Sequence, residues 1–148
     1  MVSRFERFSY AISEISRCWH KLAAQEMETY GLKAPHSVYL LALYRHPEGI
    51  TAANLSQMCG KDKADVSRMV TILEEKGLVS KEGASYRALL KLTATGRSAA
   101  EQVQKRAATA VELGGEGIAD EQRELFYGML ERITGNLQIV VENGLPQG

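Results

Sequence analysis

The sequence has few of the features that mark disulfide-rich, membrane-spanning or secreted proteins. Its 148 residues include two cysteines, Cys18 and Cys59, too few for a disulfide framework. The longest stretch without a charged side chain covers only 49–60, whereas a membrane-spanning helix needs about 20 residues. No apolar segment typical of a secretory signal follows Met1, since Arg4, Glu6 and Arg7 interrupt it. A single globular domain in the reducing cytoplasm, without membrane contact, is therefore expected.

The sequence also lacks a net charge, because 18 basic side chains balance 18 acidic ones. Taken alone, this neutrality disfavours nucleic-acid binding, but the charges are unevenly distributed. Residues 60–92 carry seven basic and five acidic side chains, and residues 112–148 carry two and seven. An acidic C-terminal region thus offsets a mildly basic middle, which permits a basic DNA-facing surface of modest nonspecific affinity.

Motifs of the common enzyme classes are missing as well. The chain has no glycine-rich phosphate loop, no His-Glu-x-x-His and no nucleophile elbow. Its histidines, His20, His36 and His46, do not have the spacing of paired metal ligands. We therefore predict no enzymatic activity, no cofactor and no metal site.

Long amphipathic helices are predicted near both ends of the chain. The first begins near Phe5 and stops at Gly31, and the last begins at Asp120. An alanine-rich helix capped by Thr93 precedes the last one. The apolar stripes of the two terminal helices are Phe5, Phe8, Ile12, Ile15, Trp19 and Leu22, and Phe126, Leu130, Ile133, Leu137 and Val140. Such narrow stripes are typical of helices that pack on one or two partners, and a dimer would cover them.

The middle of the chain predicts a helix-turn-helix. A short buried helix opened by Pro35, with Val38, Leu41 and Ala42 facing inward, leads into it. Thr51 is a good N-cap for its first helix, in which Leu55 and Met58 are expected to face inward. After a turn at 59–61, Asp62 caps the second helix, which Gly77 ends in a left-handed conformation. The inward stripe of this second helix is Val66, Met69 or Val70, and Leu73.

A β-hairpin is predicted directly after the helix-turn-helix. Residues 78–80 form one strand, 81–85 a polar turn with glycine, and 86–92 a strand of approximate period two. A hairpin in this place is a wing. The predicted fold is therefore mainly α-helical with a small β-hairpin wing.

This order of elements resembles the multiple antibiotic resistance regulator (MarR) family of winged-helix repressors. The residues that carry the resemblance are Val66-Ser-Arg68, Leu73-Glu74, Gly77-Leu-Val79 and Leu92-Thr-x-x-Gly96. It implies a cytoplasmic homodimer with dimerisation helices at 1–33 and 98–143 and a DNA-binding lobe at 34–97. It also implies a pseudo-palindromic site in double-stranded DNA. At the wing tip the sequence departs from the family, because the acidic residue that many relatives place before Arg87 is missing.

The outward face of helix 62–76 predicts the DNA contacts. Small and hydroxyl side chains allow close approach to the major groove, and Arg68 can contact a guanine or a phosphate with two bonds. The N-terminus of the preceding helix suits a phosphate oxygen. The predicted DNA-binding residues are Thr51, Asn54, Lys61, Lys63, Ala64, Ser67, Arg68, Thr71, Lys81 and Arg87.

Regulation is a further implication of the resemblance. The family binds small phenolic or aromatic carboxylate effectors near its first helices, where this chain has Trp19, His20, His36, Tyr39 and Tyr44. Core and dimer packing is the favoured explanation of Trp19 and the two tyrosines. Cys18 lies where oxidant sensors of the family have a reactive cysteine, although a lone helical cysteine is more often inert. A thiol-based sensor and a protein-binding winged helix are the alternative functions.

Overall fold

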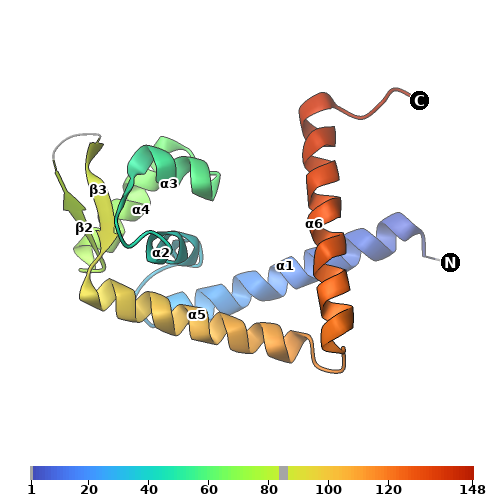
Figure 1. Cartoon of the computed structure of the whole chain (residues 1–148), viewed down its shortest axis with the longest axis horizontal. Coiled ribbons are helices and arrows are strands. Elements are labelled where there is room, and N and C mark those ends of the chain that lie inside the picture. Colours follow the sequence, from blue (N-terminus) through green and yellow to red (C-terminus); the bar gives the residue numbers. More distant parts are fainter. Residues whose placement is uncertain (1, 84–86) are drawn as a thin grey trace. The chain divides into compact units, whose positions relative to one another are not determined.

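A computed structural model describes residues 2–83 and 87–148 and divides the chain into two compact units, residues 1–107 and 108–148. Figure 1 labels the elements. The helices are α1 (Arg4–Glu28), α2 (His36–Tyr44), α3 (Ala52–Cys59), α4 (Lys63–Glu75), α5 (Ala94–Gly114) and α6 (Asp120–Asn143). The strands are β1 (Ile50–Thr51), β2 (Val79–Glu82) and β3 (Leu89–Leu92). This is the predicted mainly helical winged fold.

Hydrogen-bonding caps fix where several helices of the first unit begin. Ser3 and Glu6 form a reciprocal capping box at the start of α1. The Thr51 hydroxyl accepts a hydrogen bond from the backbone N–H of Asn54 at 3.2 Å and so caps α3, as predicted. At the start of α5 the Thr93 hydroxyl accepts from the N–H of Gly96 at 3.0 Å and donates to the carbonyl of Gly77 at 2.6 Å. Thr93 thereby links the helix after the sheet to the end of α4.

The antiparallel sheet has the strand order β1-β3-β2, so β3 is its central strand. Leu90 pairs with Ile50 of β1 on one side and with Lys81 of β2 on the other. Figure 1 shows β2 and β3 rising beside α4 from the start of α5. Strand β1, which immediately precedes α3, thus pairs with the half of β3 that is farther from α5.

The core of the first unit lies between α2, α3, α4, the sheet and the start of α5. Its most deeply buried large side chains are Met27, Tyr39, Leu40, Leu43, Leu55, Leu73 and Leu90. Within the described residues, all buried apolar side chains fall between Met27 and Val103. Gly96, Ala99 and Ala100 form the buried face of α5, so its small residues allow the close approach that the alanine-rich sequence suggested.

Several predicted details of this unit are corrected. Val38 and Met58 are 49% and 43% exposed, because α2 and α3 turn their neighbouring residues inward instead. Val70, and not Met69, continues the buried stripe of α4. The predicted turn at 81–85 begins too early, since Lys81 and Glu82 belong to β2 and pair with β3. Residues 84–86, which cover the end of the predicted turn and the expected start of the second strand, lie outside the described residues.

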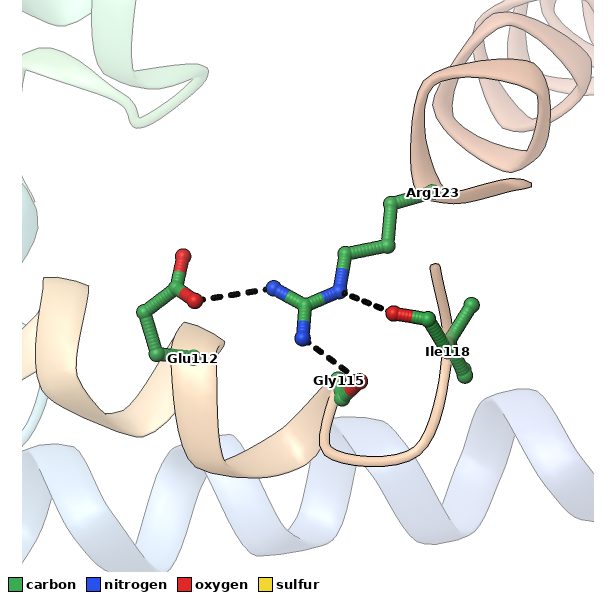
Figure 2. Close-up of polar contacts among 4 residues, drawn as sticks. All are labelled: Glu112, Gly115, Ile118 and Arg123. Carbon is green, nitrogen blue, oxygen red and sulfur yellow. Dashed lines mark hydrogen bonds and ion pairs between the residues drawn. The ribbon is translucent and has the colours of Figure 1, made fainter. Parts of the chain in front are cut away.

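The second unit contains the end of α5 and the whole of α6. Arg123 ties the connection together, as Figure 2 shows. Its guanidinium donates to the Glu112 carboxylate at 2.9 Å, to the Gly115 carbonyl at 2.7 Å and to the Ile118 carbonyl at 3.1 Å. These bonds satisfy carbonyl groups that the helix end and the turn would otherwise leave open.

The terminal helices keep apolar side chains exposed within one chain. In α1, Phe5, Ile15 and Leu22 are 76%, 49% and 45% exposed. In α6 no residue is buried, and Phe126 and Leu137 are 45% and 51% exposed. The narrow stripes that the sequence predicts are therefore present on helices, and many of their side chains are exposed among the described residues.

Candidate nucleic-acid interface

Helix α4 is defined sharply at both ends. Asp62 accepts a hydrogen bond from the backbone N–H of Asp65 at 2.8 Å, which satisfies a free donor of the first turn. At the other end the N–H groups of Gly77 and Leu78 bond to the carbonyls of Glu74 and Leu73, both at 2.9 Å. Gly77 adopts the left-handed φ of 73° that this Schellman motif requires. Both predicted helix ends are confirmed.

The helix presents two contrasting faces. Val66, Val70 and Leu73 are buried at the helical spacing of three and four residues. Because the core fixes this rotation, the opposite face is exposed to solvent. It consists of Lys63, Ala64, Ser67, Arg68 and Thr71. The structure therefore exposes together the five residues of α4 that the sequence assigns to DNA.

A surface groove adjoins this face on the side of the sheet. It has a volume of about 300 Å³ and is lined by Lys63 and Ser67 of α4, Lys81 of β2, and Ala52 and Ala53 of α3, among others. Lys81 Nζ lies 3.2 Å from Oε1 of Glu74, so this lysine is held between the helix and the wing. Three predicted DNA contacts, Lys63, Ser67 and Lys81, thus line one groove.

Thr51 and Asn54 lie on a second groove, of about 500 Å³, beside His46 and Glu48. His46 Nδ1 lies 3.3 Å from a carboxylate oxygen of Glu48. The Thr51 hydroxyl caps α3. Thr51 and Asn54 both line this groove at the start of α3, the place that the sequence predicts for them. Neither groove includes any of the five predicted effector residues.

Two hydrogen bonds on the exposed face of α4 were not expected from composition. The Arg68 guanidinium donates to the Asp65 carboxylate one helical turn earlier. The Thr71 hydroxyl donates to the backbone carbonyl of Ser67 at 2.8 Å, which leaves its lone pairs available as acceptors. The spacing of three residues between Asp65 and Arg68 is the sequence signal that predicts such a pair.

The other predicted DNA residues are exposed at the edges of this face. Lys61 lies in the turn before α4, and Arg87 lies in the segment that leads into β3. Within the described residues, Lys61 and Lys63 take part in no ion pair. Lysine side chains of this kind suit phosphate groups as mobile point charges.

The predicted effector residues are distributed over different environments. Trp19 and His20 are exposed on α1, and the Tyr44 hydroxyl donates to Glu101 at 3.4 Å. His36 and Tyr39 are buried in the core, where His36 Nε2 and the Tyr39 hydroxyl have no hydrogen-bond partner among the described residues. Burial lowers the pKa of His36, against the opposing effect of its hydrogen bond to Lys33, and burial raises the pKa of Tyr39.

The two cysteines differ in their surroundings. Cys18 is exposed on α1, whereas Cys59 is half-buried at the end of α3. Burial raises the pKa of the Cys59 thiol, although Arg45 and Lys61 act in the opposite direction. A raised pKa reduces the reactive thiolate form of Cys59, so its burial favours a packing role.

Among 2–83 and 87–148, no group of three or more His, Cys, Asp or Glu side chains is arranged to hold a metal ion. No helix in this part of the chain combines the length and apolar character needed to cross a membrane.

The fold and this surface define a winged helix-turn-helix protein. Residues 30–86 match the sequence profile of the MarR family. No match to a curated protein sequence was found. The structure resembles a MarR transcriptional regulator from Methanosarcina mazei Go1 with a TM-score of 0.75 and 25% identity, covering 90% of this chain and 99% of that one.

Two further solved structures share the fold across nearly their whole length. A MarR-family regulator from Silicibacter pomeroyi has a TM-score of 0.75 and 20% identity, covering 91% of this chain and 92% of that one. A protein from Listeria monocytogenes described as a MarR-family regulator was solved in complex with a 26mer DNA. It has a TM-score of 0.77 and 19% identity, covering 94% and 96% of the two chains. Residues 30–86 of the present chain thus match the MarR family, and the chain shares the fold of solved MarR-family transcriptional regulators over most of its length.

Proposed function

We propose that this chain is a homodimeric repressor that binds a pseudo-palindromic operator in double-stranded DNA through α4 and the wing. The observation that carries the proposal is the exposed face of α4, where Ser67, Arg68 and Lys63 stand free of the core. A helix with small, hydroxyl and guanidinium side chains on one face suits the major groove.

Each part of the surface has a distinct role in this proposal. Arg68 reads a base edge, since its fork of donors matches the two acceptors of guanine. Lys61, Lys63 and Lys81 contact phosphates and position the helix, with Thr51 and Asn54 at the start of α3. Ala64 allows close approach, and the hydroxyl groups of Ser67 and Thr71 face the groove. Arg87 contacts the backbone or the minor groove from the wing.

The dimer in this proposal is formed by the helices at 1–33 and 98–143, with 34–97 as the DNA-binding lobe. The exposed apolar side chains of α1 and α6 support it, because such stripes become stable when a second copy covers them. Two lobes related by two-fold symmetry would bind half-sites about one helical turn apart.

Tuning by a small phenolic or aromatic carboxylate compound belongs to the same proposal. Trp19 and His20 are exposed on α1 and accessible to such a ligand, whereas His36 and Tyr39 lie in the core. No observation favours oxidant sensing at Cys18 over this function, because exposure alone does not make a thiol reactive.

Selection from a library of random DNA duplexes, followed by gel-shift titration, tests the proposal. The wild-type dimer should enrich an inverted repeat, and Arg68→Ala should weaken binding to it by about 1–3 kcal/mol per half-site while the dimer persists. Arg17→Ala is the matched control, since Arg17 forms a similar exposed pair with Glu14 in α1.

Salt dependence separates DNA binding from a protein-binding winged helix. The logarithm of the association constant should fall linearly with the logarithm of salt concentration, with a slope of about −0.9 per phosphate contacted. Failure of the wild-type protein to enrich any sequence would contradict the proposal, as would a salt-independent interaction.

A further inference from the structure

Helix α4 has two carboxylates at its start, Asp62 at the N-cap and Asp65 in the first turn, on an element whose exposed face we assign to DNA. Carboxylates repel phosphate, so each requires a reason to be there. Asp62 has one, because its side chain caps the helix through the backbone N–H of Asp65. The Asp65 carboxylate does not take part in that cap.

The partner of the Asp65 carboxylate among the described residues is Arg68. Both side chains lie at the surface, with 38% of Asp65 and 66% of Arg68 exposed. Exposed pairs at this spacing contribute little to folding stability, because solvent screens their attraction. Asp65 gains stability from its place in the first turn of α4, where a carboxylate interacts favourably with the helix dipole, and this benefit does not require the bond to Arg68.

The geometry of the pair leaves the reading edge of the arginine available. A single bond joins Nη2 of Arg68 to Asp65, so the second N–H of Nη2 still forms a two-donor edge with the neighbouring Nη1 or Nε for a base. A long arginine side chain samples many rotamers, and ordering it before binding reduces the entropy lost on binding. Lys61 and Lys63 have no such carboxylate partner within the described residues.

We infer that Asp65 is a specificity-determining residue, which positions the Arg68 guanidinium for a base edge and withholds it from the phosphates. This inference rests on the proposed DNA-binding function. Asp65 itself does not contact DNA and acts through Arg68. The negative charge of Asp65 lowers the affinity of the protein for every DNA duplex. The bond from Arg68 to Asp65 restores affinity only for the correct DNA sequence.

The two effects of the charge predict opposite outcomes, which makes the inference testable. With a duplex selected by the wild-type protein and a scrambled duplex of equal composition, Asp65→Ala should strengthen binding to the scrambled duplex. It should also reduce the ratio of specific to nonspecific affinity by about tenfold, within the range of a bidentate base contact. The salt slope on the scrambled duplex should become steeper by about 0.9 per protomer, because Arg68 is then free to contact phosphate.

Two further variants separate positioning from simple charge removal. Asp62→Asn removes a charge from the same turn but keeps a capping side chain, and should leave the specificity ratio unchanged. Asp65→Glu keeps a carboxylate within reach of Arg68 and should retain most of the ratio. Thermal unfolding followed by circular dichroism establishes that each variant folds.

Three outcomes would overturn the inference. Asp65→Ala could change binding to both duplexes in equal proportion, as expected for Asp62→Asn. It could leave the ratio and the salt slope unchanged, or Asp65→Glu could lose as much specificity as Asp65→Ala. If the wild-type protein selects no sequence, the proposed function fails and this inference fails with it, whereas the other outcomes contradict the role of Asp65 alone.

Discussion

The segment from Met27 to Val103 in the first unit and helix α6 in the second unit differ in the burial of their apolar side chains. Between Met27 and Val103, leucine, valine and tyrosine side chains are buried against one another, with Leu40, Leu55 and Leu73 fully covered. In α6 the apolar residues are as regularly spaced, yet none is buried. The first unit therefore has a core of its own, whereas no described residue of α6 is buried.

This contrast relates stability to function. A lobe with its own core can hold the exposed face of α4 in a fixed orientation, because Val66, Val70 and Leu73 anchor its other side. An uncovered stripe on α6 is instead available for association. The same physical effect, burial of apolar surface, thus supports the DNA-facing geometry within the chain and, in our proposal, the assembly between chains.

Glycine substitution should show this contrast most strongly. A Cβ at Gly96 would overlap the carbonyl oxygen of Leu78 and lie 2.8 Å from its carbonyl carbon, so backbone must move. We expect Gly96→Ala to lower the free energy of unfolding by about 4 kcal/mol. A Cβ at Gly128 in α6 meets nothing within 4 Å, so Gly128→Ala should stabilise by up to about 1 kcal/mol. Urea unfolding measures both, and equal effects would contradict the contrast.

Leucine truncation should separate the two regions by their dependence on concentration. Leu73→Ala should lower the free energy of unfolding by about 3 kcal/mol at any protein concentration, because Leu73 is buried within the chain. Leu137→Ala removes a side chain that is 51% exposed and should act chiefly on the dimer. Its effect should therefore grow on dilution, in unfolding and in light-scattering measurements.

A dilution-independent loss for Leu137→Ala would show that its burial occurs within one chain. A dilution-dependent loss for Leu73→Ala would show that the first unit does not fold without its partner. Either result would break the proposed division between a self-sufficient lobe and partner-dependent helices.

Removing Arg123 should loosen the second unit by an intermediate amount. Its guanidinium makes three hydrogen bonds around the α5–α6 connection (Figure 2). We expect Arg123→Ala to lower the free energy of unfolding, and Arg123→Lys to recover only part of the loss, because an ammonium group cannot reproduce the planar fork. Amide hydrogen exchange at 115–122 should increase in both variants, while exchange in α4 stays unchanged.

The smallest expected effect is a pH dependence within the core of the first unit. Burial lowers the pKa of His36, so the unfolded chain takes up its proton at a higher pH than the folded chain. Stability should therefore fall as pH decreases below the ordinary histidine pKa of about 6.5. His36→Phe should reduce the difference in unfolding free energy between pH 7.5 and pH 5.5. His20→Gln, on exposed α1, should retain it, and an unchanged difference in His36→Phe would contradict the assignment.

Local features of this chain were predictable because their causes lie within a few residues. The caps at Thr51 and Asp62, and the Schellman motif at Gly77, depend on bonds between residues three to five apart. The same holds for the boundaries of α3 and α4. Candidate DNA residues on α4 followed from subtracting the buried stripe, since a helix has a fixed period.

Other features needed contacts between distant segments. Strand β1 has only two residues, and no pattern reveals that Ile50 pairs with Leu90. The exposure of Val38 and Met58 depends on which neighbours cover α2 and α3, so hydrophobicity alone misassigned them. The requirement for glycine at position 96 arises from the backbone at Leu78, which lies in another element.

The sequence by itself determined the helices, their ends, the winged helix-turn-helix order and the family resemblance, because these depend on periodicity and short-range hydrogen bonds. Only the tertiary structure decided which faces are covered, that β3 is central, and that Lys63, Ser67 and Lys81 line one groove. The tertiary structure also showed that the Arg68 guanidinium forms an ion pair with the Asp65 carboxylate. Side-chain surroundings depend on the folded chain as a whole, since burial and charge pairing are properties of space and not of sequence order.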